Sequence, residues 1–165
     1  MILAFPEIAE RGWSMLRDRL SDALKTGMKT KDVRTVATVR LILAALKDRD
    51  IAERGKGNYD GITEDAILTM LQSMIKQRRE SIVMYKKGGR PGLAEQEAGE
   101  IAIIEQFLPA QIAGDEMENI IKGVIAELGA NNLKDMGRIM SVLKERHAGC
   151  MDFAKAGAIV KNMLS

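Results

Sequence analysis

The chain has 165 residues, of which 46% are hydrophobic and 29% are charged, and its formal net charge is +2. This balance is typical of one or two small globular domains and argues against a disordered chain. Aromatic residues make up only 4%, whereas methionine occurs 11 times. A core of aliphatic residues and methionine favours packed helices over a β-sandwich, because strands are rich in aromatic and β-branched residues.

Turn and capping residues predict seven helices in chain order. They follow a lead-in at residues 1–14, in which the apolar residues show no clear helical or strand periodicity. Ser14, Thr63 and Asp152 are the clearest N-terminal capping residues, and Gly129 is a natural C-terminal cap. No segment alternates apolar and polar residues, so no sheet is predicted. The predicted helices span residues 15–28, 30 or 32 to 54, 63–87, 93–108, 115–128, 133 or 135 to 147, and 153–164.

A domain boundary is predicted at residues 109–114. Pro109 disfavours a helical conformation at the residue before it, and Gly114 follows shortly afterwards. The boundary separates a helical N-terminal domain of about four helices, residues 15–108, from a small three-helix bundle, residues 109–165. The predicted fold class is therefore all-α.

The chain contains a single cysteine, Cys150, and a single histidine, His147. An internal disulfide is therefore impossible, which favours a reducing compartment, and the usual structural zinc set cannot be assembled. The apolar runs are too short to span a bilayer, and the lead-in carries two glutamates without a long apolar stretch. We predict a cytoplasmic protein with no metal, no cofactor and no membrane contact.

Charged residues fall inside the apolar faces of three predicted helices. At 100° per residue, Arg78 lies in the middle of the apolar face of the third helix, and Glu97 lies within that of the fourth. A buried ion without a partner costs several kcal/mol, so Arg78 should pair with a carboxylate, and Glu97 is its predicted partner. Arg40 and Lys47 project from an apolar arc of the second helix, which consists of Val33, Val36, Ala37, Leu43, Ala44 and Ile51.

These charges allow two interpretations. The Arg78–Glu97 pair could fix the packing register of two helices. Alternatively, Arg40, Lys47, Arg78 and Glu97 could line a cleft that holds a small anion. We assign no catalytic residue, because His147 and Cys150 lie at a helix end with no third group to orient them.

Two stretches, residues 25–49 and 76–90, each carry a net charge of +5. They could form a phosphate-binding face, or they could be solvated helix faces that pair with the acidic stretch at residues 95–105. Neither stretch has the interleaved aromatic side chains of a platform for single-stranded nucleic acid. If RNA binds, we expect contacts to its backbone charge and shape.

Short motifs along the chain carry a family resemblance. They include MKTKD at residues 28–32, AALKD at 44–48, KQRRESI at 76–82, GRPGLA at 89–94, EAGE at 97–100, LP at 108–109 and GANNLKDMG at 129–137. In this order and spacing, they resemble the GatB/YqeY family. Two departures are Gly27, where the family usually has alanine, and GCMD at residues 149–152, where it more often has Gly-Arg/Lys-Ala-Asp.

The resemblance implies a function. The C-terminal domain is similar to the tail of the GatB subunit of tRNA-dependent amidotransferase, which helps to hold tRNA. We therefore expect a module that binds tRNA or associates with an amidotransferase or another translation component, without a catalytic centre of its own. The family-level label is nevertheless carbon–nitrogen ligase activity with glutamine as the amide donor. The RNA-binding candidates are Lys134, Arg138, Lys144 and Arg146.

Two alternatives stay open. The chain could be a protein-interaction module, which would include self-association through methionine-rich surface. It could also be an enzyme that acts on a small anionic substrate at the Arg40, Lys47, Arg78 and Glu97 cluster. The sequence does not indicate an oligomeric state.

Overall fold

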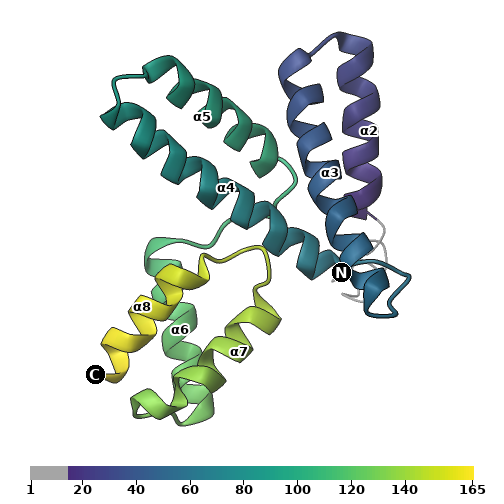
Figure 1. Cartoon of the computed structure of the whole chain (residues 1–165). Coiled ribbons are helices and arrows are strands. Elements are labelled where there is room, and N and C mark those ends of the chain that lie inside the picture. Colours follow the sequence, from purple (N-terminus) through teal and green to yellow (C-terminus); the bar gives the residue numbers. More distant parts are fainter. Residues whose placement is uncertain (1–14) are drawn as a thin grey trace, which may run out of the picture. The chain divides into compact units, whose positions relative to one another are not determined.

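The computed structural model describes residues 15–165, and this part of the chain is all-α (Figure 1). It contains seven α-helices and one short 3-10 helix, and its only extended pairing is an isolated bridge between Ile112 and Met151. The all-α prediction is confirmed. The expected lead-in at residues 1–14 and its Ser14 cap lie outside the described residues.

Residue contacts divide the chain into two compact units, one ending at Leu108 and the other running from Pro109 to Ser165. No helix in residues 15–165 combines the length and the apolar character needed to cross a bilayer. Each unit has its own aliphatic core.

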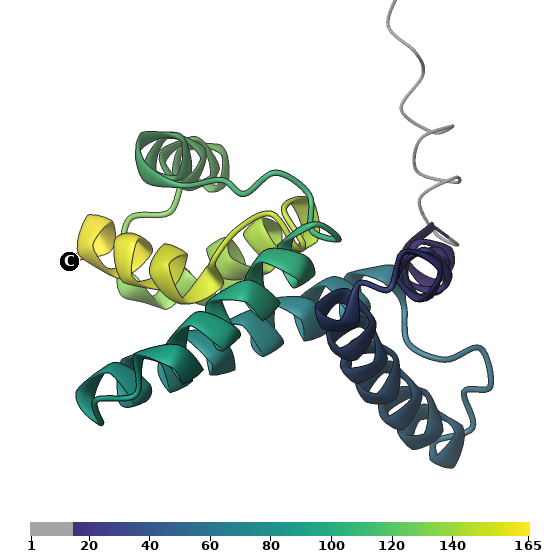
Figure 2. The same cartoon turned by 90° about the horizontal axis from the view of Figure 1, so that it is seen from above.

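The first unit consists of two helical hairpins (Figures 1 and 2). Helices α2 (Met15–Thr30) and α3 (Val33–Gly55) form one, and α4 (Glu64–Lys87) and α5 (Pro91–Glu105) form the other. The hairpins join where α3 packs against α5 and α4. The fully buried side chains of their common core include Leu20, Val39, Ile42, Ile67, Leu71 and Ile104.

The second unit packs three helices, α6 (Gly114–Leu128), α7 (Met136–Arg146) and α8 (Phe153–Leu164), against one another. A short 3-10 helix, Leu133–Asp135, leads into α7. The core of this unit is built from Met117, Ile121, Val124, Ile139, Leu143, Met151, Ala156 and Val160.

Capping residues set the helix ends largely as the sequence predicts. The Thr63 hydroxyl accepts a hydrogen bond from the backbone N–H of Ala66 at 3.2 Å, and Asp152 accepts from the first turn of α8. Gly129 ends α6 in the left-handed conformation, with φ 61°. These ends follow from local side-chain chemistry, which explains why they are visible in the sequence.

The fourth predicted helix differs from α5 at both ends. Helix α5 begins at Pro91 rather than at residue 93, because proline fits the first helical turn, where its missing N–H is not needed. It ends at Glu105 rather than at residue 108. Just before Pro109, the chain continues with 3-10-type hydrogen bonds, in which an N–H donates to the carbonyl three residues earlier. An example is the 3.1 Å bond from the Leu108 N–H to the Glu105 carbonyl.

The predicted apolar face of α3 is wrong except at its edge, where Leu43 packs partly buried against the core. The buried residues of this helix are Thr38, Val39, Ile42 and Leu46, which lie on the opposite side from the predicted arc. Within that arc, Val33, Ala37, Ala44 and Ile51 are exposed, and Arg40 and Lys47 are exposed with them. Helix α3 has apolar residues on two faces, and the helices that pack against it, mainly α2 and α5, decide which of them is buried.

Candidate functional site

The guanidinium group of Arg78 in α4 lies beside the carboxylates of Glu97 and Glu100 in α5. Its Nε donates a hydrogen bond to Oε2 of Glu100 at 2.9 Å and lies 3.9 Å from Oε2 of Glu97. Its Nη1 also donates to the backbone carbonyl of Met74 at 3.2 Å, and the side chain is only 13% exposed. The predicted partner Glu97 is thus within ion-pair distance, but Glu100 makes the hydrogen bond.

Glu100 is not the ion-pair partner of Arg78 that the sequence predicts, although the spacing of the glutamates on α5 indicates it. The glutamates of EAGE at residues 97–100 are three apart, so they lie on the same face of α5 and can reach the same cation. Because two carboxylates surround Arg78, its positive charge is already compensated. This arrangement disfavours a second, free anion at Arg78.

The predicted four-residue anion cluster is not assembled. Arg40 and Lys47 are exposed, and no described hydrogen bond or ion pair joins either of them to Arg78 or Glu97. The physical reason is the orientation of α3, which turns Arg40 and Lys47 outward. The interhelical pair and the exposed cations are therefore separate features of the first unit.

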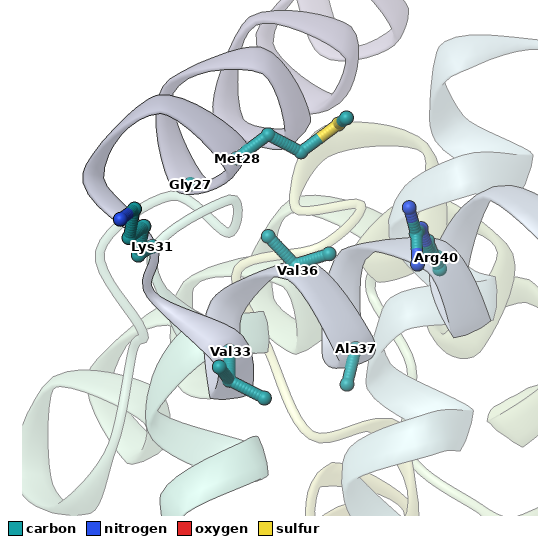
Figure 3. A pocket seen from close by; sticks show the side chains of 7 residues that line it. All are labelled: Gly27, Met28, Lys31, Val33, Val36, Ala37 and Arg40. Carbon is teal, nitrogen blue, oxygen red and sulfur yellow. The ribbon is translucent and has the colours of Figure 1, made fainter.

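Arg40 instead borders a hollow at the turn between α2 and α3 (Figure 3). The turn is fixed by Lys31, which has φ 56°, and by Asp32, whose carboxylate accepts hydrogen bonds from the backbone N–H and hydroxyl of Thr35 at 3.1 and 2.7 Å. The hollow has a volume of about 330 Å³. It is lined by Gly27, Met28, Lys31, Val33, Val36, Ala37 and Arg40.

The lining of this hollow defines its chemistry. Its floor is apolar, and Lys31 and Arg40 stand on either side of Val36 (Figure 3). Its lining residues include no nucleophile paired with a base. The hollow suits a group that combines an apolar surface with an anion, and it is not arranged for acid–base catalysis.

The four RNA-binding candidates lie in the second unit, and two of them are already paired. Arg146 forms two hydrogen bonds of 2.7 Å with the Glu127 carboxylate, which lowers the pKa of Glu127 and raises that of Arg146. Arg138 lies 3.3 Å from Asp135 and donates to the Leu128 carbonyl.

Lys134 and Lys144 differ from these two arginines. Both lysines are exposed, and neither has an ion-pair partner among residues 15–165. No described interaction links the four candidates to one another.

The loop around His147 and Cys150 connects the second unit internally. The Cys150 carbonyl accepts a hydrogen bond from Ile112 N–H at 2.7 Å, and Cys150 N–H donates to the His147 carbonyl at 3.1 Å. Burial raises the pKa of the Cys150 thiol, which keeps it protonated and weakly nucleophilic at neutral pH. Within residues 15–165, no three His, Cys, Asp or Glu side chains are grouped so that they could hold a metal ion.

These features define a class of all-α protein: two helical hairpins with an ion-paired interior, followed by a three-helix unit, with cations exposed on both. The sequence profile of the Yqey-like protein family matches residues 17–164, and the chain belongs to this family.

Curated relatives of the chain are named Altered inheritance of mitochondria protein 41, mitochondrial. The protein of this name from Lachancea thermotolerans is 30% identical over 115 residues, which cover 68% of this chain and 59% of the relative. The one from Kluyveromyces lactis is 32% identical over 91 residues, which cover 55% of this chain and 47% of the relative. The chain thus spans about half the length of the curated relatives that it matches.

Proposed function

We propose that this Yqey-like chain is a tRNA-binding helical module that acts by binding, without a catalytic centre of its own. The resemblance of its C-terminal domain to the tail of GatB supports tRNA as the ligand. The same resemblance supports an amidotransferase or another translation component as the assembly in which the module works. Carbon–nitrogen ligase activity would then belong to that assembly rather than to this chain.

The observation that carries this proposal is a surplus of exposed cations at the helical turns. Lys86, Lys87 and Arg90 surround the α4–α5 turn, and Lys29 and Lys31 lie at the α2–α3 turn. All five are exposed, and none has a carboxylate partner among the described residues. Lys134 and Lys144 of the second unit share this property. Unpaired exposed cations are the groups that neutralise RNA phosphates.

A salt-dependent titration tests the proposal. The full chain is titrated with total tRNA at two NaCl concentrations, and the logarithm of the affinity should fall linearly with the logarithm of the salt concentration. The Lys86→Glu, Lys87→Glu double variant should weaken binding by about tenfold or more and reduce the slope of this dependence. The Lys134→Glu, Lys144→Glu variant should weaken it as well.

A matched control separates local contacts from overall charge. Lys155→Glu with Lys161→Glu changes the net charge equally at two exposed positions of α8 outside the proposed contacts, so it should weaken tRNA binding less. The proposal fails if the chain does not bind tRNA at low salt, or if all three double variants behave alike.

The compartment is part of the same proposal. The names of the curated relatives place those proteins in mitochondria, whereas the sequence of this chain predicts the cytoplasm. Both compartments contain tRNA and a translation apparatus. The proposed ligand is therefore available in either one.

A further inference from the structure

Helix α3 presents a regular stripe of exposed side chains, which we call the α3 seam: Val33, Ala37, Arg40, Ala44, Lys47 and Ile51. The intervals between these residues alternate between four and three. This is the heptad spacing with which a helix packs against a second helix in a coiled coil. The seam runs along most of α3, which extends from Val33 to Gly55.

Within residues 15–108, the seam takes no part in the packing of the core. Helix α3 buries the opposite face, with Val39, Ile42 and Leu46, in the core that it shares with α2 and α5. On the seam, Val33 is 79% exposed and Ile51 is 53% exposed. A solvated helix face normally carries polar residues, whereas four of the six seam residues are apolar and the other two are cations. Such a row at heptad spacing favours a surface that another helix covers.

The side chains of the seam define the chemistry of that helix. Ala37 and Ala44 leave shallow holes that large apolar side chains of a facing helix can fill. Arg40 and Lys47 are seven residues apart, and the seam contains no carboxylate. A facing helix therefore needs acidic residues one heptad apart. At the Val33 end, the seam opens into the hollow of Figure 3, which could accept a further apolar side chain between Lys31 and Arg40.

Two other occupants fit less well. A second copy of the chain would bring four cations and no carboxylate into the same seam, which is unfavourable. RNA would leave the exposed valine, alanine and isoleucine side chains without an apolar partner. We infer that the α3 seam docks an acidic amphipathic helix of a partner protein, with heptad packing.

The test uses the full chain and a defined probe. The probe is a fluorescent helical peptide of about three heptads, with leucine and glutamate alternating along its seam, and a matched peptide has lysine in place of each seam glutamate. Fluorescence anisotropy should show that the glutamate peptide binds at least about tenfold more tightly than the lysine peptide. The double variant Arg40→Glu, Lys47→Glu should reverse this preference.

Two further variants separate specific docking from general attraction. Lys25→Glu with Lys76→Glu changes the net charge equally at exposed positions of α2 and α4, and it should keep the preference for the glutamate peptide. Ala44→Arg adds a cation but fills a hole of the seam. This variant should therefore weaken binding of the glutamate peptide, whereas a purely electrostatic contact would become tighter. All of these positions are exposed, so circular dichroism and Tm should stay unchanged.

Four results would overturn the inference. The first is that the chain does not bind the glutamate peptide, and the second is that it binds both peptides equally well. The third is that the Ala44→Arg variant binds the glutamate peptide more tightly than the parent chain does. The fourth is that sedimentation shows self-association of the chain, which the Arg40→Glu, Lys47→Glu variant abolishes. The proposed tRNA binding depends mainly on the exposed cations at the helical turns, such as Lys86 and Lys87, so it can fail while peptide docking holds. If the Arg40→Glu, Lys47→Glu variant loses tRNA binding and the parent chain does not bind the peptide, the seam belongs to an RNA site.

Discussion

Arg17 of α2 and Asp50 of α3 form a bidentate ion pair, with N···O distances of 2.7 and 2.9 Å. The same side chains hold the loop that precedes α4. Arg17 donates to the Ile62 carbonyl at 3.0 Å, and the Asp50 carboxylate accepts from the Ile62 N–H at 2.9 Å. The neighbouring residue is Gly61, with φ 83°, and a Cβ at this position would collide with the Asp50 carboxylate. The pair therefore connects the first hairpin to the start of the second.

The Arg17–Asp50 pair makes stability depend on pH. The hydrogen bond from Arg17 lowers the pKa of Asp50 below its usual 3.8, so the unfolded chain takes up this proton more readily. The contribution of the pair is therefore complete above about pH 5, declines as the pH falls through the unfolded value of 3.8, and is lost below the lowered pKa. We expect Asp50→Asn to lower the free energy of unfolding by about 1–2 kcal/mol at pH 7.

Urea unfolding of both proteins at pH 7 and pH 3 checks this expectation. The difference between parent and variant should become smaller at pH 3. Burial raises the pKa of nearby Glu64, which acts in the opposite direction, but both proteins contain this group. A difference that is independent of pH would contradict the argument.

The two carboxylates beside Arg78 should differ in their contribution to stability. Glu100→Gln should cost about 1–2 kcal/mol, because Glu100 accepts the 2.9 Å hydrogen bond from a side chain that is largely buried. Glu97→Gln should cost less than about 1 kcal/mol, because its carboxylate lies 3.9 Å away. Chemical denaturation of Arg78→Gln, Glu100→Gln and the double variant measures the coupling free energy between Arg78 and Glu100. Equal costs for the two glutamates would disprove this ranking.

Gly27 marks a close approach between α2 and α3. A Cβ at this buried position would lie 3.0 Å from Cγ2 of Val36. Gly27→Ala should therefore gain little or lose stability, despite the gain of about 1 kcal/mol expected from helix propensity. In a Val36→Ala background, the same substitution should be stabilising relative to its parent.

Gly123 of α6 provides the matched control for Gly27. Nothing lies within 4 Å of its added Cβ, so Gly123→Ala should gain about 1 kcal/mol. The Tm values of the Gly27 and Gly123 variants test both statements. A clear stabilisation by Gly27→Ala alone would show that the helices are not in close contact at this position.

Thr38 is buried in α3, and its hydroxyl has no hydrogen-bond partner in the part of the chain that the structure describes. Thr38→Val replaces this hydroxyl with a methyl group of similar size, so it should stabilise the protein by about 1 kcal/mol. Thr35→Val should have the opposite sign, because the Thr35 hydroxyl donates to the capping carboxylate of Asp32 at 2.7 Å. Thermal unfolding of the two variants would refute the prediction if their Tm values shifted in the same direction.

The sequence by itself determined the fold class and most helix ends. Thr63 and Asp152 accept hydrogen bonds from the first turns of their own helices, and Gly129 ends α6 by its own φ angle. These interactions join residues only a few positions apart, so they can be read locally. The sequence also indicated that Arg78 needs a carboxylate, because an unpaired charge on an apolar face is costly.

Only the tertiary structure decided which face of α3 is buried and which glutamate binds Arg78 most closely. Val39 and Ile42 on one face and Val33 and Ile51 on the other are all apolar, and the choice depends on the helices that pack against α3. Glu97 and Glu100 lie about one helical turn apart on α5. The rotation and translation of α5 against α4 select between them, and these are set by the whole core rather than by any local segment.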